Sequence, residues 1–205
     1  MKMEMLLALM NIMITLFFIV PIEKSSMAAG KKKTKAVTLK MAQQCQEMLL
    51  DNKWRLDLSF RGITTVPKEV LMLYGRDEVN LSRNLIKKLP DFCETMENIN
   101  VLDLHSNKLE QLPATIYHLK NLQALNLCNN CLKGVPKELG LLNNLQTLHL
   151  GMNQLKVLPG SIGDLTELRY IGLSDNQFTR KPHCLSRLKK LERVNLDRNP
   201  ILTED

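Results

Sequence analysis

The sequence predicts an α/β solenoid, a curved horseshoe in which a 23-residue unit stacks side by side with a parallel sheet on the concave face. Two sequence registers carry this prediction. Asparagine recurs with that period at positions 84, 107, 130, 153, 176 and 199, and proline recurs at positions 67, 90, 113, 136, 159 and 182. Two independent registers that keep one period without a slip indicate a repeated structural unit rather than a coincidence.

Residues 99–121 are the clearest copy of this unit. Leu102 and Leu104 are two positions apart, as a short strand with one buried face requires. Asn107 carries an amide that both donates and accepts, so it can satisfy backbone groups where the chain leaves the strand. Pro113 fixes φ and suits the start of a returning segment of short helical turns on the convex face. The pattern L-x-x-L-x-L-x-x-N-x-L is that of a leucine-rich repeat.

We assign residues 53–205 to the repeat array, about 6.5 units long, and divide the preceding residues into three segments. Residues 1–26 form an apolar extension, in which residues 5–20 contain no charged side chain. This stretch is short for a membrane span and long enough for the apolar region of a signal peptide. Because Met27 offers a plausible start, three interpretations stay open: a sequence upstream of the usual start, a membrane anchor or a cleaved signal.

Two further segments lead into the array. Residues 27–36 are a basic and flexible leader. In residues 37–52, Met41, Cys45 and Met48 follow helical spacing, which predicts an amphipathic helix. A solenoid needs an atypical unit to cover the open core of its first repeat, so we expect this helix to cap the array.

The distribution of charge gives information about possible partners, and the number and positions of the cysteines give information about the cellular compartment. The net charge is +7, and six lysines fall between positions 24 and 40 without an acidic residue among them. Such a run is usually a solvated tail, although it also suits a membrane surface or a nucleic acid. The five cysteines are odd in number and form no cluster at either end, which is unlike a disulfide-capped secreted array. We expect a cytoplasmic protein, with a membrane-anchored form whose repeats face the cytosol as the alternative.

The sequence contains no pattern that predicts catalysis. It has no nucleophile elbow and no glycine-rich phosphate loop. Cys128 and Cys131 form a single C-x-x-C, and no second pair completes a set of four metal ligands. We therefore expect no enzyme activity, no cofactor and no metal site.

The informative positions are those that the repeat pattern leaves free. Residues that flank the apolar positions of each strand face the concave surface, through which solenoids commonly bind their ligands. From them we predict a protein-binding face formed by Phe60, Arg83, Asp103, His105, Asn126, His149, Tyr170, Asp175 and Arg193. The set is mixed in sign, whereas a nucleic acid would favour a basic stripe with stacking aromatic residues. We expect an unidentified protein ligand, no nucleic acid and a monomeric chain.

The 23-residue form with its asparagine and Leu/Val-Pro pair resembles the short intracellular leucine-rich repeat proteins, which include scaffolds of the Ras pathway. The stretches GKKKTKAVTLKMAQQC, RLDLSFRGITTVPKEVL, LSRNLIKKLPD, LDLHSN and VNLDRNP resemble more closely the family of leucine-rich repeat-containing protein 18. The resemblance covers residues 27–200, and residues 1–26 have no counterpart in it. It implies a cytoplasmic, non-enzymatic protein of male germ cells, and it implies no defined partner.

Overall fold

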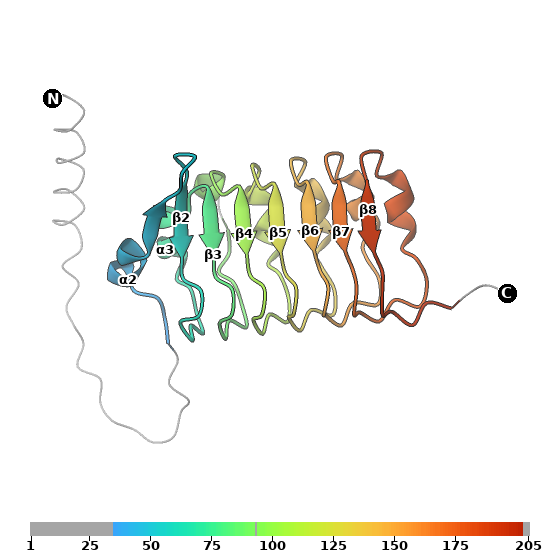
Figure 1. Cartoon of the computed structure of the whole chain (residues 1–205), viewed down its shortest axis with the longest axis horizontal. Helices are drawn as coiled ribbons and strands as arrows, with labels where there is room; N and C mark the ends of the chain where they lie inside the picture. Colours follow the sequence, from blue (N-terminus) through green and yellow to red (C-terminus); the bar gives the residue numbers. More distant parts are fainter. Residues whose placement is uncertain (1–34, 93, 203–205) are drawn as a thin grey trace, which may run out of the picture. The chain divides into compact units, whose positions relative to one another are not determined.

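The structure is a computed structural model that describes residues 35–92 and 94–202. Within these residues, eight short strands form one sheet in the order β1 to β8 (Figure 1). The strands are β1 (Gln46–Met48), β2 (Trp54–Asp57), β3 (Glu78–Asn80), β4 (Val101–Asp103), β5 (Ala124–Asn126), β6 (Thr147–His149), β7 (Tyr170–Gly172) and β8 (Arg193–Asn195). Strands β2 to β8 pair in parallel with one another, whereas β1 pairs antiparallel with β2, and the predicted α/β leucine-rich repeat solenoid is confirmed.

The register of the sheet follows the sequence period. Val79 lies opposite Leu102, and Leu102 lies opposite Leu125, so each residue pairs with the residue 23 positions later. The middle residue of each of these strands is buried, and the leucine that follows the strand, such as Leu104, is also buried. The array therefore has one continuous core in which each unit packs on the next, as a solenoid requires.

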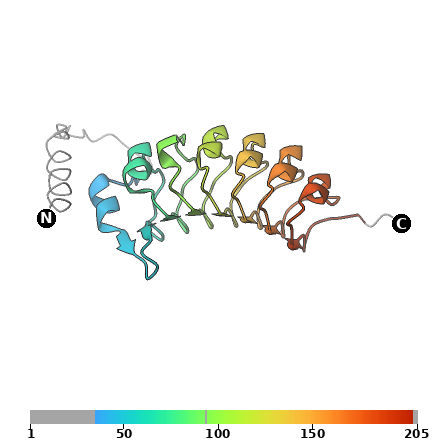
Figure 2. The same cartoon turned by 90° about the horizontal axis from the view of Figure 1, so that it is seen from above.

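Short helical segments return the chain on the other side of the core, and Figure 2 shows them opposite the strands. Five are 3-10 turns: Glu94–Met96, Ala114–His118, Lys137–Leu141, Gly160–Asp164 and His183–Arg187. The first repeat instead has an α-helix, α3 (Lys68–Tyr74). A proline of the predicted register is the N-cap of α3 and of the last four turns, because its fixed φ suits the residue before a helical turn.

Buried asparagines join successive repeats. The side-chain Oδ1 of Asn84 accepts hydrogen bonds from the backbone N–H groups of Arg61 and Ile63, both at 3.0 Å. Its Nδ2 donates to the backbone oxygens of Leu58, at 2.8 Å, and Leu81, at 2.9 Å. The same pattern recurs in the following repeats, so one amide satisfies backbone groups of two units inside the core.

The single helix predicted over residues 37–52 is wrong in its extent. The α-helix α2 covers only Leu39–Gln44, and the chain then forms β1. Met48, which the helical pattern placed on the buried face, is 59% exposed, whereas Ala42 is fully buried. The free edge of β2 explains the difference, because an antiparallel strand can pair with unpaired backbone groups and a helix cannot.

Several predictions fall outside the described residues. These are the apolar extension 1–26, including residues 5–20, and most of the leader 27–36. Among the residues that the structure describes, no helix has the length and apolar character needed to cross a membrane.

Candidate functional site

The concave face is the surface formed by the side chains that flank the inward-facing middle residues of β2 to β8 and by the residue that turns the chain after each of these strands. Figure 1 views the array from this side, with the strands in front of the helical turns. The turning residues all have a positive φ between 54° and 58°, and none is a glycine: Phe60, Arg83, Ser106, Asn129, Met152, Asp175 and Arg198. This left-handed conformation is uncommon for residues with a side chain, and here it occurs three residues after each of the strands β2 to β8.

The turning residues form a column along the face, because each lies one repeat from the next. Three neighbouring pairs of this column interact through their side chains. The Arg83 guanidinium carbon lies 4.9 Å from the centre of the Phe60 ring. Asn129 Nδ2 donates to Ser106 Oγ over 3.0 Å. The third pair is an ion pair between Asp175 and Arg198, so the column is held by three different kinds of contact.

Four predicted site residues meet at the N-terminal half of the face, and we call them the Arg83 cluster: Phe60, Arg83, Asp103 and His105. Arg83 Nε donates to His105 Nε2 over 3.3 Å, and His105 Nδ1 lies 2.8 Å from Asp103 Oδ1. A guanidinium has no acceptor, so Nε2 must accept and Nδ1 carries the proton donated to Asp103. The cluster therefore fixes both the tautomer of His105 and the direction of Arg83.

Three more predicted residues meet at the C-terminal half, and we call them the Tyr170 cluster: His149, Tyr170 and Arg193. The rings of His149 and Tyr170 are 4.8 Å apart between centroids, and the Arg193 guanidinium carbon lies 5.9 Å from the centre of the Tyr170 ring. Burial lowers the pKa of His149, and the charge of Asp103 opposes this effect more weakly. His149 is therefore neutral at pH 7.

Gly172 makes room for the Tyr170 cluster. A Cβ at this position would lie 3.1 Å from Tyr170 Oη and 3.5 Å from His149 Nδ1. The absence of a side chain therefore lets the tyrosine ring lie over the sheet beside the imidazole.

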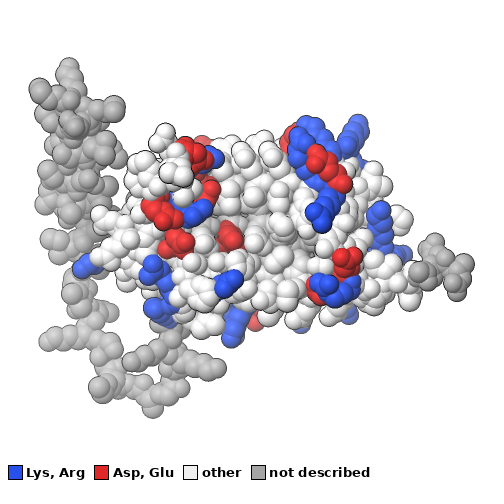
Figure 3. Space-filling model, viewed as in Figure 1, with Lys and Arg blue, Asp and Glu red and all other residues white. Residues whose placement is uncertain are grey.

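The two predicted residues outside these clusters have different surroundings. Asn126 lies on β5 between them, and its Oδ1 accepts the backbone N–H of Cys128 at 3.2 Å. Asp175 pairs with Arg198, which lowers the pKa of its carboxyl group. Charged side chains gather towards the two ends of the face, and the part over β5 and β6 carries none (Figure 3). The concave face therefore has an uncharged centre between two polar clusters.

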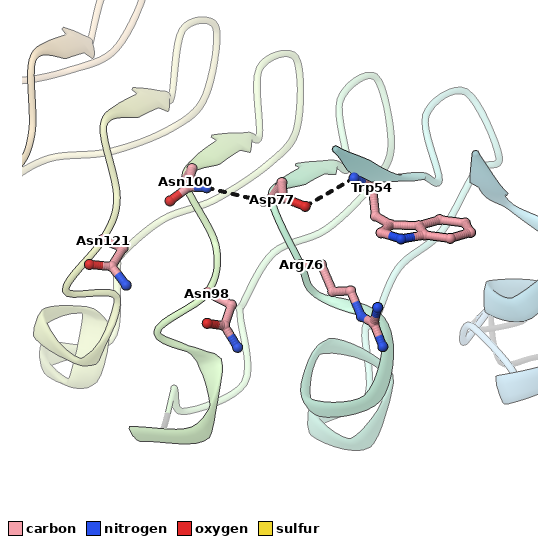
Figure 4. A pocket seen from close by; sticks show the side chains of 6 residues that line it. All are labelled: Trp54, Arg76, Asp77, Asn98, Asn100 and Asn121. Atoms are coloured by element: carbon pink, nitrogen blue, oxygen red, sulfur yellow. Dashed lines mark hydrogen bonds between the residues drawn. The ribbon is translucent and has the colours of Figure 1, made fainter. Parts of the chain in front are cut away.

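A separate pocket of about 420 Å³ lies at the N-terminal ends of β2 to β4 (Figure 4), lined by Trp54, Arg76, Asp77, Asn98, Asn100 and Asn121. Asp77 Oδ2 accepts the backbone N–H of Trp54 at 2.9 Å, and its Oδ1 accepts from Asn100 Nδ2 at 3.3 Å. One carboxylate thus connects three successive repeats. The sequence prediction missed this pocket, although the chain's single tryptophan and Arg76 at an apolar repeat position were signals for it.

The chemistry of the concave face suits binding. Cys128 of the single C-x-x-C is half-buried, and burial raises the pKa of its thiol, so it is not an activated nucleophile. In the ranges 35–92 and 94–202, no three His, Cys, Asp or Glu side chains are grouped to hold a metal ion. The predicted site omitted two residues that support it. Gly172 makes room for Tyr170, and Arg198 pairs with Asp175. The sequence signal for Gly172 was a glycine at a concave position that the repeat pattern leaves free.

The family model for the leucine-rich repeat matches four overlapping stretches, 77–132, 97–155, 120–178 and 143–201. Together they span residues 77–201, which is 125 of the 205 residues. The chain belongs to the leucine-rich repeat family. Leucine-rich repeat domains bind protein partners, so the family agrees with an interaction surface on this array.

Two solved leucine-rich repeat structures are similar to this chain. One is the ectodomain of the plant membrane receptor kinase GASSHO1/SCHENGEN3 from Arabidopsis thaliana, in complex with CASPARIAN STRIP INTEGRITY FACTOR 2. It has a TM-score of 0.66 and 25% identity over 81% of this chain and 20% of the receptor. The other is internalin C2 from Listeria monocytogenes, with a TM-score of 0.61 and 27% identity over 73% of this chain and 63% of internalin. This chain therefore spans less than two thirds of either protein.

Proposed function

We propose that this protein is a non-enzymatic scaffold that binds a protein partner on its concave face. The observation that carries the proposal is the arrangement of that face, in which two ordered side-chain clusters flank an uncharged centre. Aromatic residues and arginine are enriched in protein interfaces and dominate their binding energy, and both clusters contain them. Met152, which is 54% exposed, adds a flexible apolar side chain to the same face.

Site-specific photo-crosslinking tests this proposal on the full chain. A photoreactive amino acid replaces Met152 on the concave face, or Leu141 on the convex turn Lys137–Leu141 as the matched control. The two side chains are similarly exposed, at 54% and 58%, so they differ mainly in the face that they occupy. We expect a discrete protein adduct from position 152 and not from position 141. Equal adducts from both positions, or an adduct from position 141 alone, would refute the concave site.

We further propose that the protein acts in the cytoplasm as a monomer. The odd cysteine count supports the compartment, and the resemblance to the family of leucine-rich repeat-containing protein 18 supports a role in male germ cells. Light scattering of the purified chain tests whether it is a monomer.

The alternative is the same scaffold tethered to a membrane by residues 5–20, whose lack of charge supports it. Carbonate extraction separates the two, because a tethered chain stays with the membranes and an untethered chain is released.

A further inference from the structure

Two arginines on the concave face have no carboxylate partner among the described residues. They are Arg83, after β3, and Arg193, on β8, and both are exposed. Other arginines of this face are paired: Arg55 Nη2 lies 2.7 Å from Glu78 Oε2, and Arg198 Nη2 donates to Asp175 Oδ2 over 2.7 Å. Arginine on this surface is therefore not unpaired in general, and the lack of a carboxylate partner is specific to positions 83 and 193.

Both free guanidinium groups are held in place by aromatic rings. Arg83 lies over Phe60 and uses its Nε to donate to His105, and its two terminal nitrogens have no acceptor among the described residues. Arg193 lies over Tyr170. A guanidinium that is already oriented loses less side-chain entropy when it binds a carboxylate through two parallel hydrogen bonds. The two arginines are thus prepared for anionic groups that the described residues do not supply.

Most carboxylates of the face are already bound to donors. Asp57 accepts the backbone N–H of Ser59, Glu78 pairs with Arg55, and Asp103 accepts from His105. Asp175 is paired with Arg198, and Asp197 in the last repeat is the concave carboxylate whose side chain has no donor among the described residues. Two guanidinium groups of the face, at separate places, therefore have no carboxylate partner among the described residues. Asp57 and Asp103 accept only from neutral donors, Asp197 has no donor there, and the centre of the face is uncharged.

The sheet fixes the separation of these two charges. Arg83 follows β3 and Arg193 lies on β8, which is five strands further along the sheet. Neighbouring strands are about 4.8 Å apart, so the two positions are separated by about 24 Å along the array. The register places Arg193 level with Glu78, five residues before Arg83, and this offset adds about 16 Å along the strand direction. The direct separation is therefore about 29 Å, which about nine residues of an extended peptide cover at about 3.3 Å per residue. The uncharged residues beneath such a peptide are Asn126, Cys128, His149, Gly151 and Gly172.

We propose that the concave face binds an extended peptide segment of its partner that carries two acidic residues about nine positions apart, with uncharged residues between them. One acidic side chain pairs with Arg83 and the other with Arg193. A nucleic acid fits this surface less well, because its phosphates are evenly spaced and would meet the uncharged centre and the neighbouring carboxylates. This inference rests on the proposed concave binding site and names the chemistry of the ligand.

Selection from a displayed library of eleven randomised residues on the immobilised full chain tests the inference. We expect enriched peptides with two Asp or Glu residues about eight to ten positions apart and uncharged residues between them. Synthetic copies should bind Arg83→Gln and Arg193→Gln about tenfold more weakly in fluorescence anisotropy. Arg55→Gln and Arg187→Gln, whose guanidinium groups are paired within the chain with Glu78 and Asp164, are the matched controls and should change binding less than threefold. Replacing one acid of the peptide with lysine should restore binding to Arg83→Glu.

Other outcomes would overturn the inference. Enriched peptides without an acidic pair, affinity that does not depend on the spacing of the acids, or equal losses in the control variants would each do so. A single-stranded oligonucleotide that bound with the same dependence on both arginines would replace the peptide with a nucleic acid. If peptides without acids compete with the adduct formed at position 152, the concave site stands and only its proposed ligand chemistry fails. If acidic peptides bind but crosslink at position 141, the concave site itself fails.

Discussion

Asn84 Oδ1 accepts the backbone N–H of Ile63, which lies 21 residues earlier, at 3.0 Å, and the side chain of Asn84 is buried. Asn107, Asn130 and Asn153 make the corresponding bond to the repeat before them. The ladder puts a polar amide at a point where backbone groups of two repeats would otherwise be buried without partners. We therefore expect the array to depend on each rung for its stability.

Replacing Asn130 with alanine should strongly destabilise the array. Its Oδ1 accepts from Leu109 N, and its Nδ2 donates to the backbone oxygens of Leu104, at 3.0 Å, and Leu127, at 3.1 Å. Alanine leaves these groups buried without partners, so the free energy of unfolding should fall by about 3 kcal/mol. Urea unfolding followed by circular dichroism measures the change. Asn143→Ala is the control, because Asn143 is exposed without a side-chain hydrogen bond among the described residues, and it should stay within about 0.5 kcal/mol. Equal effects of the two variants would contradict a structural role for the ladder.

The repeat fold could be predicted from sequence because the positions that determine it are local and periodic. The asparagine and proline registers, with the apolar positions between them, specify the strand, the turn and the returning segment of each unit. The N-terminal segment shows the limit of such patterns. Met41, Cys45 and Met48 have helical spacing, but β1 forms because the edge of β2 offers unpaired backbone groups. That requirement arises from the assembled sheet and is absent from the local pattern.

The concave positions could also be predicted, since the alternation of each strand decides which side chains face outwards. The contacts between these side chains could not be predicted from the sequence. The stacking of Arg83 on Phe60 depends on a left-handed backbone and on rotamers of residues 23 positions apart. Asp103 and Asp175 looked alike in sequence, yet one orients a histidine and the other pairs with an arginine. Whether these residues bind a partner stays a prediction.

Asp77→Ala should loosen the N-terminal end of the array. The carboxylate accepts the backbone N–H of Trp54 at 2.9 Å and the side chain of Asn100 at 3.3 Å. Hydrogen bonds to a charged acceptor contribute about 1.5–3 kcal/mol, and partial exposure places this pair near the lower end, so we expect a loss of about 2 kcal/mol. The rate of amide hydrogen exchange at Trp54 should increase in this variant more than the rates in β6 do. Asn121→Ala, in the same pocket without a side-chain bond in the described part of the chain, should leave exchange unchanged. Unaltered exchange in Asp77→Ala would show that the carboxylate does not hold this end.

Gly172→Ala should displace Tyr170 with little change in overall stability. The added Cβ would lie 3.1 Å from Tyr170 Oη, so the ring has to move away from His149. The loss of this contact destabilises the folded chain. Alanine opposes this effect because its backbone has less conformational entropy than glycine in the unfolded chain. The free energy of unfolding should therefore change by less than about 1 kcal/mol. The ring protons of His149 should shift in NMR spectra as the tyrosine ring moves. Gly134→Ala, where a Cβ meets nothing within 4 Å, should leave these resonances unchanged. Unchanged His149 resonances in Gly172→Ala would contradict the assigned role of this glycine.

The stability of the array should fall on acidification in part through His149. Burial lowers the pKa of His149 in the folded chain, and the charge of Asp103 offsets this only in part. The unfolded chain, with an ordinary histidine pKa near 6.5, therefore takes up a proton at a higher pH than the folded chain does. The contribution of neutral His149 is complete above about pH 6.5 and declines as the pH falls through that value towards the folded pKa. Urea midpoints at pH 7.5 and pH 5.0 should accordingly differ less in His149→Gln than in the unmodified chain. If the two proteins lose the same stability over this interval, the half-buried imidazole of His149 does not contribute to the acid sensitivity of the fold.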